Sequence, residues 1–487
     1  MHRSVFVILF LWVCLPLSVL AQTTSEHIDD MFNQYERYEQ FSGAVLLENN
    51  GDIILRGGYG VADRELNVPA SAENRFVIGS MSKAFNAALA VSLSQQGVFD
   101  LDDPVVSLWP EFNDPSGGHI TMRQVLTHHS GLPHWGAIED FLLTDAAYEW
   151  DPAELVNRYA ETGLQFEPGS DQSYSSLGFM AAAVAMEQVT GTLYHDLLRT
   201  HLFEPLGMAD TVADSVSIIE NRAADYRYNF LEARYENGEF RHPSTQFGTG
   251  DILTTVDDLQ IWASAIRGDY PDVLTPEILS VILGPDDGER AYGWNRTEDD
   301  NGGYTRVYSH GGLVAGFRSQ IVIDVDRRQT LIMLGNLRDI DANRITRAVF
   351  AALNDDVRVA VPRDLMREIL EVSATQNNDA VVNFIRTVLR DHADEYYPNP
   401  IGWVMAAVEL RSDGACNRAI DIYDLWLELN PGHPVAGTVL QHETDCALNL
   451  SQLDRAERLI EAIEARGADL ESYTPLVERL REARAGR

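Results

Sequence analysis

The stretch Gly79-Ser80-Met81-Ser82-Lys83 follows a short apolar run, residues 76–78, and opens a segment with helical periodicity. Lys83 is the only lysine in the chain, although lysine and arginine together number 37. Arginine stays protonated in proteins, whereas burial and positive surroundings can bring a lysine amine to its neutral form. The lone lysine therefore indicates a position that requires an amine able to act as a base.

The residues after Ser80 predict a buried helix. Apolar side chains recur with helical spacing from Met81 to Leu93, residues 87–91 are apolar on every side, and Gly97 ends the pattern. Ser80 and Lys83 would then share one helix face, where the amine can take the hydroxyl proton and activate a nucleophile. Burial and the positive end of the helix disfavour the ammonium form, and backbone N–H groups there can hold an oxyanion.

A simpler interpretation makes Ser80 a helix cap and Lys83 a surface residue. It is disfavoured because a surface lysine would be interchangeable with arginine, and every other basic residue here is an arginine.

The length and composition of the chain limit the number of domains and the kinds of partner that it can have. The 487 residues suffice for about three ordinary domains. The chain has 74 acidic against 37 basic residues and a formal charge of -37, which argues against nucleic acid or anionic membrane surfaces as partners.

The N-terminus has the three parts of a secretory signal. Met1-His2-Arg3 precedes an apolar run over residues 5–20, and cleavage is expected after Ala21, so the mature protein is expected to be exported, to the periplasm or the outside. Cys14 lies in this leader after Val13, which disfavours a lipoprotein anchor. No later apolar run is long enough to span a bilayer. Cys416 and Cys446 remain, either as a disulfide or as two buried thiols.

Two hairpins and several helices predict an α+β domain. A helix is expected over residues 25–38, and Asn50-Gly51 between the runs 43–47 and 53–56 is a strong hairpin signal. Residues 317–324 and 330–334 form the second predicted hairpin.

Beyond about residue 360 the pattern becomes wholly helical. We place a boundary near Val361-Pro362, which divides the chain into residues 1–21 (signal peptide), 26–355 and 362–487. In the helical part, a predicted helix pair ends at Leu429-Asn430-Pro431 and partly matches tetratricopeptide-type repeats, which bind proteins.

Further side chains are candidates for the site. Tyr174 is expected at a loop-to-helix junction, facing a cleft or packed on the sheet. His310, followed by two glycines and a strand, is either a satisfied strand histidine or a donor at a cleft edge, where the N–H of Leu313 could meet a substrate carbonyl. A zinc site at His128, His129 and His134 is disfavoured, because no carboxylate or cysteine stands at ligand spacing.

Three motifs in order, Ser80-Met81-Ser82-Lys83, Tyr174-Ser175-Ser176 and His310-Gly311-Gly312, resemble those of the serine β-lactamase and penicillin-binding protein superfamily. The nearest branch is the class C-like one, with D-alanyl-D-alanine carboxypeptidases, D-aminopeptidases and carboxylesterases. The likeness covers about residues 26–355. It includes the framing segments Leu126-Thr127-His128-His129-Ser130-Gly131-Leu132-Pro133, Phe166-Glu167-Pro168-Gly169, Phe203-Glu204-Pro205-Leu206-Gly207-Met208 and Asp258-Leu259 after Thr254-Thr255.

The resemblance implies an antiparallel sheet flanked by helices, with a helical lobe. It also implies roles. Ser80 is acylated, Lys83 and Tyr174 share the proton transfers, and the N–H groups of Ser80 and Leu313 form the oxyanion hole. Ser176, His310, Gly312 and Leu313 would contact the substrate.

Two departures from the family pattern bear on the substrate. Ser176 replaces the usual asparagine and so removes an amide donor, and His310-Gly311-Gly312 replaces Lys-Thr-Gly, which removes a permanent cation and a hydroxyl.

We therefore expect an exported serine acyl hydrolase of the esterase or D-amino-acid peptidase type, acting on a small ester, amide or peptide. No metal and no organic cofactor is expected. The alternatives are a catalytically weak penicillin- or peptidoglycan-binding protein, or a true β-lactamase. The resemblance does not extend to the helical tail, which is expected to bind a protein partner.

Overall fold

The computed structural model describes residues 23–138, 141–229, 232, 234–284, 290–298, 304–354, 358–396, 400–467 and 470–486. The expected signal peptide, residues 1–21, lies outside the described residues. No helix within these ranges has the length and apolar character needed to cross a membrane.

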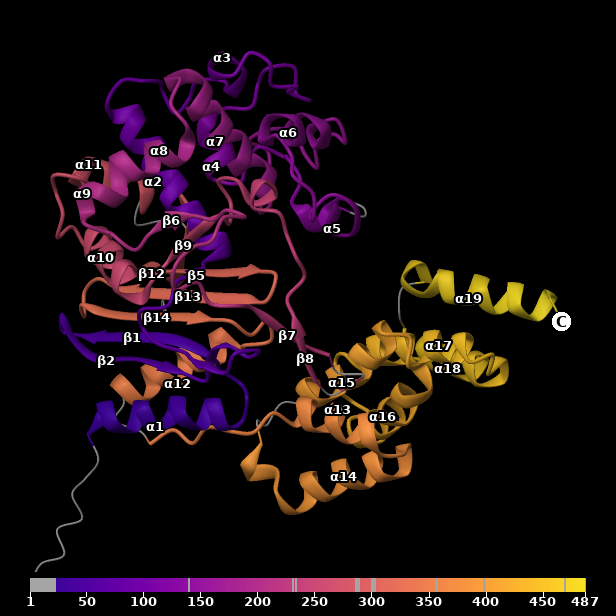
Figure 1. Ribbon diagram of the computed structural model, residues 1–487. Coiled ribbons are helices and arrows are strands. Elements are labelled where there is room, and N and C mark those ends of the chain that lie inside the picture. Colours follow the sequence, from indigo (N-terminus) through magenta and orange to yellow (C-terminus); the bar gives the residue numbers. More distant parts are fainter. Residues whose placement is uncertain are drawn as a thin grey trace, which may run out of the picture.

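A seven-stranded antiparallel sheet forms the centre of the first part of the chain (Figure 1). Its strand order is β10-β11-β12-β13-β14-β1-β2, so the first hairpin pairs with the last strand, and Gly43 lies opposite Gly335. In that order the strands are β10 (Arg290–Ala291), β11 (Trp294–Glu298), β12 (Tyr304–Val314), β13 (Phe317–Asp324), β14 (Gln329–Gly335), β1 (Gly43–Asn49) and β2 (Asp52–Tyr59).

Both predicted hairpins are confirmed. Asn50 and Gly51 connect β1 to β2 with positive φ angles of 55° and 88°, as the tight turn requires. Strands β13 and β14 pair from Asp324 and Gln329 at the turn.

The alternation of side chains along β1 divides the core into two layers. Ala44 and Leu46 face one side, whereas Val45 and Leu47 face the other. Helices α1 (Thr24–Arg37) and α12 (Ala342–Asn354) cover the second face (Figure 1). Helix α1 confirms the helix predicted over residues 25–38.

A helical lobe covers the first face. Its centre consists of α2 (Ser82–Gln95) and α7 (Ser176–Thr190), which are buried almost all round, as their alanine-rich sequences predict. The other helices are α3 (Val105–Leu108), α4 (Met122–Leu126), α5 (Phe141–Thr144), α6 (Pro152–Ala160), α8 (Tyr194–Leu198), α9 (Glu204–Leu206), α10 (Val256–Ile266) and α11 (Pro276–Ile282).

Short elements complete this part. Four are helical segments: η1 (Gly79–Met81), η2 (Trp135–Ala137) and η4 (Pro243–Gln246) are 3₁₀ turns, and η3 (Arg199–Phe203) is a π-helix. The small sheets consist of β5 (Phe76–Val77), β9 (Ile252–Thr254) and β6 (Val212–Ala213), of β3 (Val61–Asp63) and β4 (Val68–Pro69), and of β7 (Tyr226–Asn229) and β8 (Arg234–Asn237).

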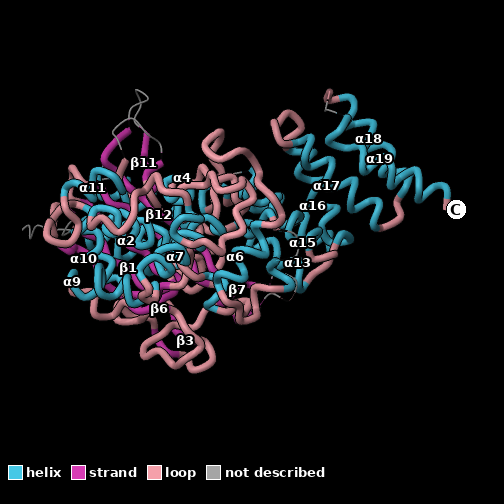
Figure 2. Tube along the Cα trace, turned by 90° about the horizontal axis from the view of Figure 1, so that it is seen from above, coloured by secondary structure: helices cyan, strands magenta, loops and turns pink. Residues whose placement is uncertain are grey.

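The C-terminal part is helical and has its own apolar core, from Leu365 to Leu480. Its helices extend away from one side of the sheet-containing body (Figures 1 and 2). They are α13 (Leu365–Thr375), α14 (Asn378–Asp391), the 3₁₀ turn η5 (Ala393–Glu395), α15 (Pro400–Ser412), α16 (Cys416–Leu429), α17 (Ala436–Asn449), α18 (Leu453–Ala465) and α19 (Leu470–Ala485). The domain boundary near Val361 and the tetratricopeptide likeness stay predictions.

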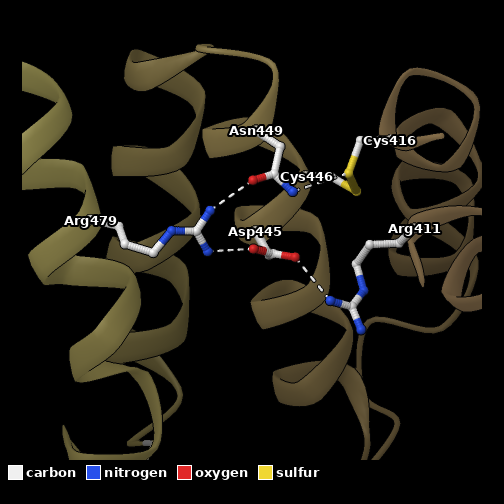
Figure 3. Close-up of a disulfide and its surroundings, with 6 residues drawn as sticks. All are labelled: Arg411, Cys416, Asp445, Cys446, Asn449 and Arg479. Carbon is white, nitrogen blue, oxygen red and sulfur yellow. Dashed lines mark hydrogen bonds and ion pairs between the residues drawn. A yellow bond between two sulfur atoms is a disulfide. The ribbon is translucent and has the colours of Figure 1, made fainter. Parts of the chain in front are cut away.

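A disulfide between Cys416 and Cys446 joins α16 to α17, with 4.9 Å between the Cα atoms (Figure 3). Of the two states that the sequence leaves open for these cysteines, the structure has the disulfide. Beside it, Asp445 accepts hydrogen bonds from Arg411 and Arg479 (Figure 3). The disulfide thus links α16 to α17 covalently, and the two ion pairs of Asp445 hold α15 and α19 against α17.

The β7–β8 hairpin reaches from the body to the tail (Figure 1). The Tyr228 hydroxyl donates to Glu371 on α13 at 3.2 Å, and the Arg367 guanidinium lies 4.2 Å from the centre of the Tyr228 ring. Arg367 also donates to the Glu39 carbonyl at 2.9 Å. Helix α13 therefore contacts both the segment that follows α1 and the hairpin.

Candidate active site

Ser80 lies in the 3₁₀ turn η1, between β5 and α2. We expected Ser80 on the helix itself, but α2 begins two residues later, at Ser82. Strand β9 holds the turn in place, because Ile78 N–H donates to the Ile252 carbonyl at 3.0 Å and Ile252 N–H donates to Ser82 Oγ at 3.3 Å. Gly79, next to Ser80, has a φ of 52°, which glycine adopts with little strain.

Lys83 lies inside the lobe with 1% of its surface exposed. Its Nζ atom donates to Ser80 Oγ at 3.3 Å and to the Thr249 carbonyl at 3.0 Å, and lies 5.0 Å from the centre of the Tyr174 ring. The predicted contact between the amine and the serine hydroxyl is therefore present. A surface position for Lys83 is ruled out.

Tyr174 lies one residue before Ser175, the N-cap of α7, as the sequence predicts. Ser175 Oγ accepts from Gly178 N–H at 2.9 Å, and Ser175 N–H donates to His128 Nδ1 at 3.0 Å. The His128 ring packs on the Tyr174 ring at 4.5 Å between centroids, and the His134 ring meets it edge-on at 5.2 Å. These contacts hold the tyrosine ring toward Lys83.

The three histidines considered for zinc have different positions. His128 accepts a backbone hydrogen bond, and His129 Nδ1 lies 3.1 Å from Thr127 Oγ1. Burial, and secondarily the charge of Lys83, lowers the pKa of His134 to about 4. Among the residues that the structure describes, no group of three or more His, Cys, Asp or Glu side chains is arranged to hold a metal ion.

Strand β12 passes directly alongside the turn that carries Ser80. A Cβ atom on Gly312 would lie 1.9 Å from the Ile78 carbonyl oxygen, and one on Gly79 would lie 3.0 Å from Leu313 N. Ser319 Oγ on β13 donates to the same Ile78 carbonyl at 2.7 Å. Glycine at 312 thus permits the close approach that brings the backbone of Leu313 beside the turn that carries Ser80.

His310 lies within β12, whereas we expected it before a strand. The ring is buried, with 6% exposed, and Nδ1 donates to the Gly311 carbonyl at 2.7 Å. The residues that line the cleft around Ser80 do not include His310. They are Ser80, Lys83, His134, Trp135, Gly136, Tyr174, Ser176, Arg241, Gln246, Thr249, Leu313, Val314, Ala315 and Arg338. The structure therefore brings Ser80, Lys83, Tyr174, Ser176 and Leu313 to one cleft, and Gly312 and His310 are not among the residues that line it.

Three residues of this region were not predicted from the sequence. Asn86 is buried and donates to the carbonyls of Phe179 at 3.0 Å and Gly248 at 2.9 Å, so it ties α2 to α7 and to the loop that carries Thr249. A buried asparagine on an otherwise apolar helix was the available signal. Arg241 and Arg338 could not be singled out from the sequence, because arginine is common throughout the chain.

The turn that carries Ser80, the buried amine of Lys83 and Tyr174 beside them have the arrangement of a serine hydrolase of the β-lactamase and penicillin-binding protein class. The Beta-lactamase family profile matches residues 28–355, and the chain belongs to this family. The resemblance stated from the three motifs is confirmed.

Curated relatives include several kinds of protein. Penicillin-binding protein 4* of Bacillus subtilis (strain 168) is 26% identical over 340 residues, which is 65% of this chain and 73% of the relative. Esterase EstB of Burkholderia gladioli is 32% identical over 206 residues, 40% of this chain and 52% of the relative. The D-aminopeptidase of Brucella ovis (strain ATCC 25840 / 63/290 / NCTC 10512) is 27% identical over 333 residues, 65% of this chain and 60% of the relative.

Proposed function

We propose that the protein is an exported serine acyl hydrolase that forms an acyl-enzyme on Ser80, of the esterase or D-amino-acid peptidase type. The observation that carries the proposal is the 3.3 Å contact between the buried Lys83 Nζ and Ser80 Oγ. A serine hydroxyl is a weak nucleophile until a neighbouring base takes its proton, and the amine is the group within reach.

The reaction would proceed in two halves. Lys83, with Tyr174, takes the Ser80 proton as Oγ attacks the substrate carbonyl, and the N–H groups of Ser80 and Leu313 hold the oxyanion. The tetrahedral intermediate collapses, and the proton returns to the departing alcohol or amine. Water then attacks the acyl-enzyme through the same proton transfers and releases the acid, which restores Ser80.

Three observations support an ester or D-amino-acid substrate over a β-lactam. The names of two relatives are esterase and D-aminopeptidase. Ser176 cannot donate the amide hydrogen bond that asparagine would supply. His310 is buried, with 6% exposed, and is not among the residues that line the cleft.

The test is intact-mass analysis after exposure to a fluorophosphonate or a fluorescent penicillin. One adduct is expected on the wild type and none on Ser80→Ala. A wild-type chain that stays unlabelled, or a mutant labelled equally, contradicts the proposal. A panel of nitrocefin, a D-alanyl-D-alanine peptide, D-amino acid amides and short-chain esters, run on both proteins, then identifies the substrate class.

A second candidate is a penicillin- or peptidoglycan-binding protein with weak catalysis, which Ser176 favours. Turnover of nitrophenyl esters separates the two, because a binder would acylate slowly and then stop. A burst of nitrophenol equal to the enzyme concentration, with no steady state, would select the binder.

We further propose that the helical tail, residues 362–487, binds a protein partner, and that residues 1–21 direct export. Removal of the tail is expected to abolish complex formation and to spare ester hydrolysis. If removal unfolds the hydrolase, the tail is a structural brace instead. N-terminal sequencing of the secreted protein should begin at Gln22.

A further inference from the structure

The loop of residues 247–251, between η4 and β9, carries a carbonyl that holds the amine of Lys83. The Thr249 carbonyl accepts from Lys83 Nζ at 3.0 Å. One residue earlier, the Gly248 carbonyl accepts from the buried Asn86 side chain at 2.9 Å. The direction in which the Thr249 carbonyl points therefore depends on how this loop is held.

A buried carboxylate holds the same loop from its last residue. Asp251 is 1% exposed, and its Oδ2 atom accepts from Gly248 N–H at 3.1 Å. The same oxygen accepts from His195 Nε2 on helix α8 at 2.7 Å. The other oxygen, Oδ1, is buried and has no hydrogen-bond partner among the described residues. One carboxylate oxygen thus connects the loop to α8.

The histidine approaches the loop from a helix that is itself fixed. Tyr194 N–H, at the start of α8, donates to Glu187 Oε2 on α7 at 2.9 Å. The rings of Tyr194 and His195 pack on the Phe247 ring, with 5.1 and 5.3 Å between centroids. Helix α7 and Phe247 therefore restrict the position of the imidazole.

The contact between His195 and Asp251 is an ion pair when the imidazole is protonated. Burial lowers the pKa of His195, but the charge and hydrogen bond of Asp251, with smaller contributions from Glu187 and Asp196, leave it above its ordinary value. Loss of the cation would leave a buried carboxylate without its partner, which is costly enough to displace it. The loop that Asp251 holds would then move with it.

We propose that His195 and Asp251 are positioning residues for Lys83. The pair fixes Gly248 and, through it, the Thr249 carbonyl, which directs the amine toward Ser80. Neither His195 nor Asp251 is among the residues that line the cleft, so their effect on the reaction passes through the loop and Lys83. The inference rests on the proposed function, because it adds to the groups that activate Ser80.

The single lysine of the chain permits a direct measurement. Protein grown with lysine labelled with ¹³C at Cε, and carrying no lysine in any purification tag, gives one lysine resonance, that of Lys83. His195→Ala and Asp251→Ala are expected to move this resonance from its wild-type chemical shift. The His195→Gln resonance should stay close to the wild-type one, because the amide can donate to Asp251 in place of the imidazole.

Circular dichroism checks the fold of each variant. Asp251→Asn keeps the size of the side chain and removes its charge, so it is also expected to move the resonance, and it replaces an alanine variant that does not fold. His392→Ala is the control, because it removes an exposed histidine–carboxylate pair with Glu395 in the tail. Its lysine resonance should equal that of the wild type.

Hydrolysis of 4-nitrophenyl acetate measures the effect on the reaction. His195→Ala is expected to lower kcat about tenfold or more and to leave KM near the wild-type value, because a misdirected base slows the chemical step without removing a substrate contact. His195→Gln should recover most of the loss, and His392→Ala should keep the wild-type kcat.

The outcomes separate this inference from the proposed function. A wild-type chain that the fluorophosphonate does not label at Ser80 would overturn the function, while the lysine resonance still reports on the loop. A Lys83 resonance that does not move in folded His195 and Asp251 variants would overturn the inference alone. So would an unchanged kcat, a loss that appears only in KM, or an equal loss in His392→Ala.

Discussion

Lys83 Nζ lies 3.3 Å from Ser80 Oγ and 3.0 Å from the Thr249 carbonyl, in a pocket where the lysine is 1% exposed. The carbonyl and the serine fix the direction of the amine, and the lysine side chain has almost no exposed surface. The Ser80 hydroxyl and the Lys83 amine are thus held next to each other by the fold.

Replacing Lys83 by arginine should abolish turnover while the chain stays folded. The guanidinium cannot lose its proton, and loss of a general base costs about 10²- to 10⁴-fold in rate. Steady-state hydrolysis of a nitrophenyl ester measures the loss, and circular dichroism checks the fold. Activity retained in a folded Lys83→Arg protein would contradict the role of the amine.

Replacing Gly312 by alanine should separate β12 from the nucleophile turn, since the new Cβ atom would lie 1.9 Å from the Ile78 carbonyl. We expect kcat/KM to fall about 100-fold through a misplaced oxyanion donor, and the free energy of unfolding to fall by about 1–3 kcal/mol. Gly432→Ala is the matched control, because an added Cβ there meets nothing within 4 Å. Equal behaviour of the two variants would refute the close approach.

The pKa of His134, lowered to about 4 mainly by burial, predicts a pH dependence of stability. Between pH 6.5 and 4 the unfolded histidine binds a proton that the folded one does not, so the free energy of unfolding should fall as pH falls through this window. Urea titrations at several pH values measure the slope. His134→Phe should flatten it, and His119→Gln, at an exposed position, should not.

Removal of the disulfide should destabilise the tail. Cys416 and Cys446 are 30 positions apart, and closing a loop of this length stabilises by about 2–4 kcal/mol. We expect a reductant to lower the Tm of the wild type and to leave the Tm of the Cys416→Ser, Cys446→Ser protein unchanged. A reductant effect of equal size on both proteins would show another cause.

Replacing Arg367 by alanine should loosen the contact of α13 with the β7–β8 hairpin. The side chain lies over the Tyr228 ring at 4.2 Å and pairs with Glu371 at 3.0 Å. Hydrogen exchange should speed up in both α13 and residues 226–229. Arg390→Ala, which removes an exposed pair with its neighbour Asp391, is the control. Unchanged exchange in the Arg367 variant would contradict the coupling.

Local patterns of the sequence determined much of the fold. Asn50-Gly51 specifies a hairpin because its turn needs positive φ, and an alanine-rich segment apolar on all sides can only be a buried helix. The chemistry of the lone lysine identified Ser80 and Lys83 as partners, and the serine-rich piece before an alanine-rich helix placed Tyr174 at a junction. Each of these signals lies within a few residues of the chain.

The tertiary structure alone decided which residues surround Ser80 and Lys83. Thr249, Arg241 and Arg338 reach the cleft from loops far from Ser80 in the sequence, and no local pattern distinguishes these arginines from the others. Burial of His310 likewise depends on which strands and loops cover β12. Side-chain spacing encodes helices and strands, whereas a substrate cleft depends on contacts between segments that only the folded chain brings together.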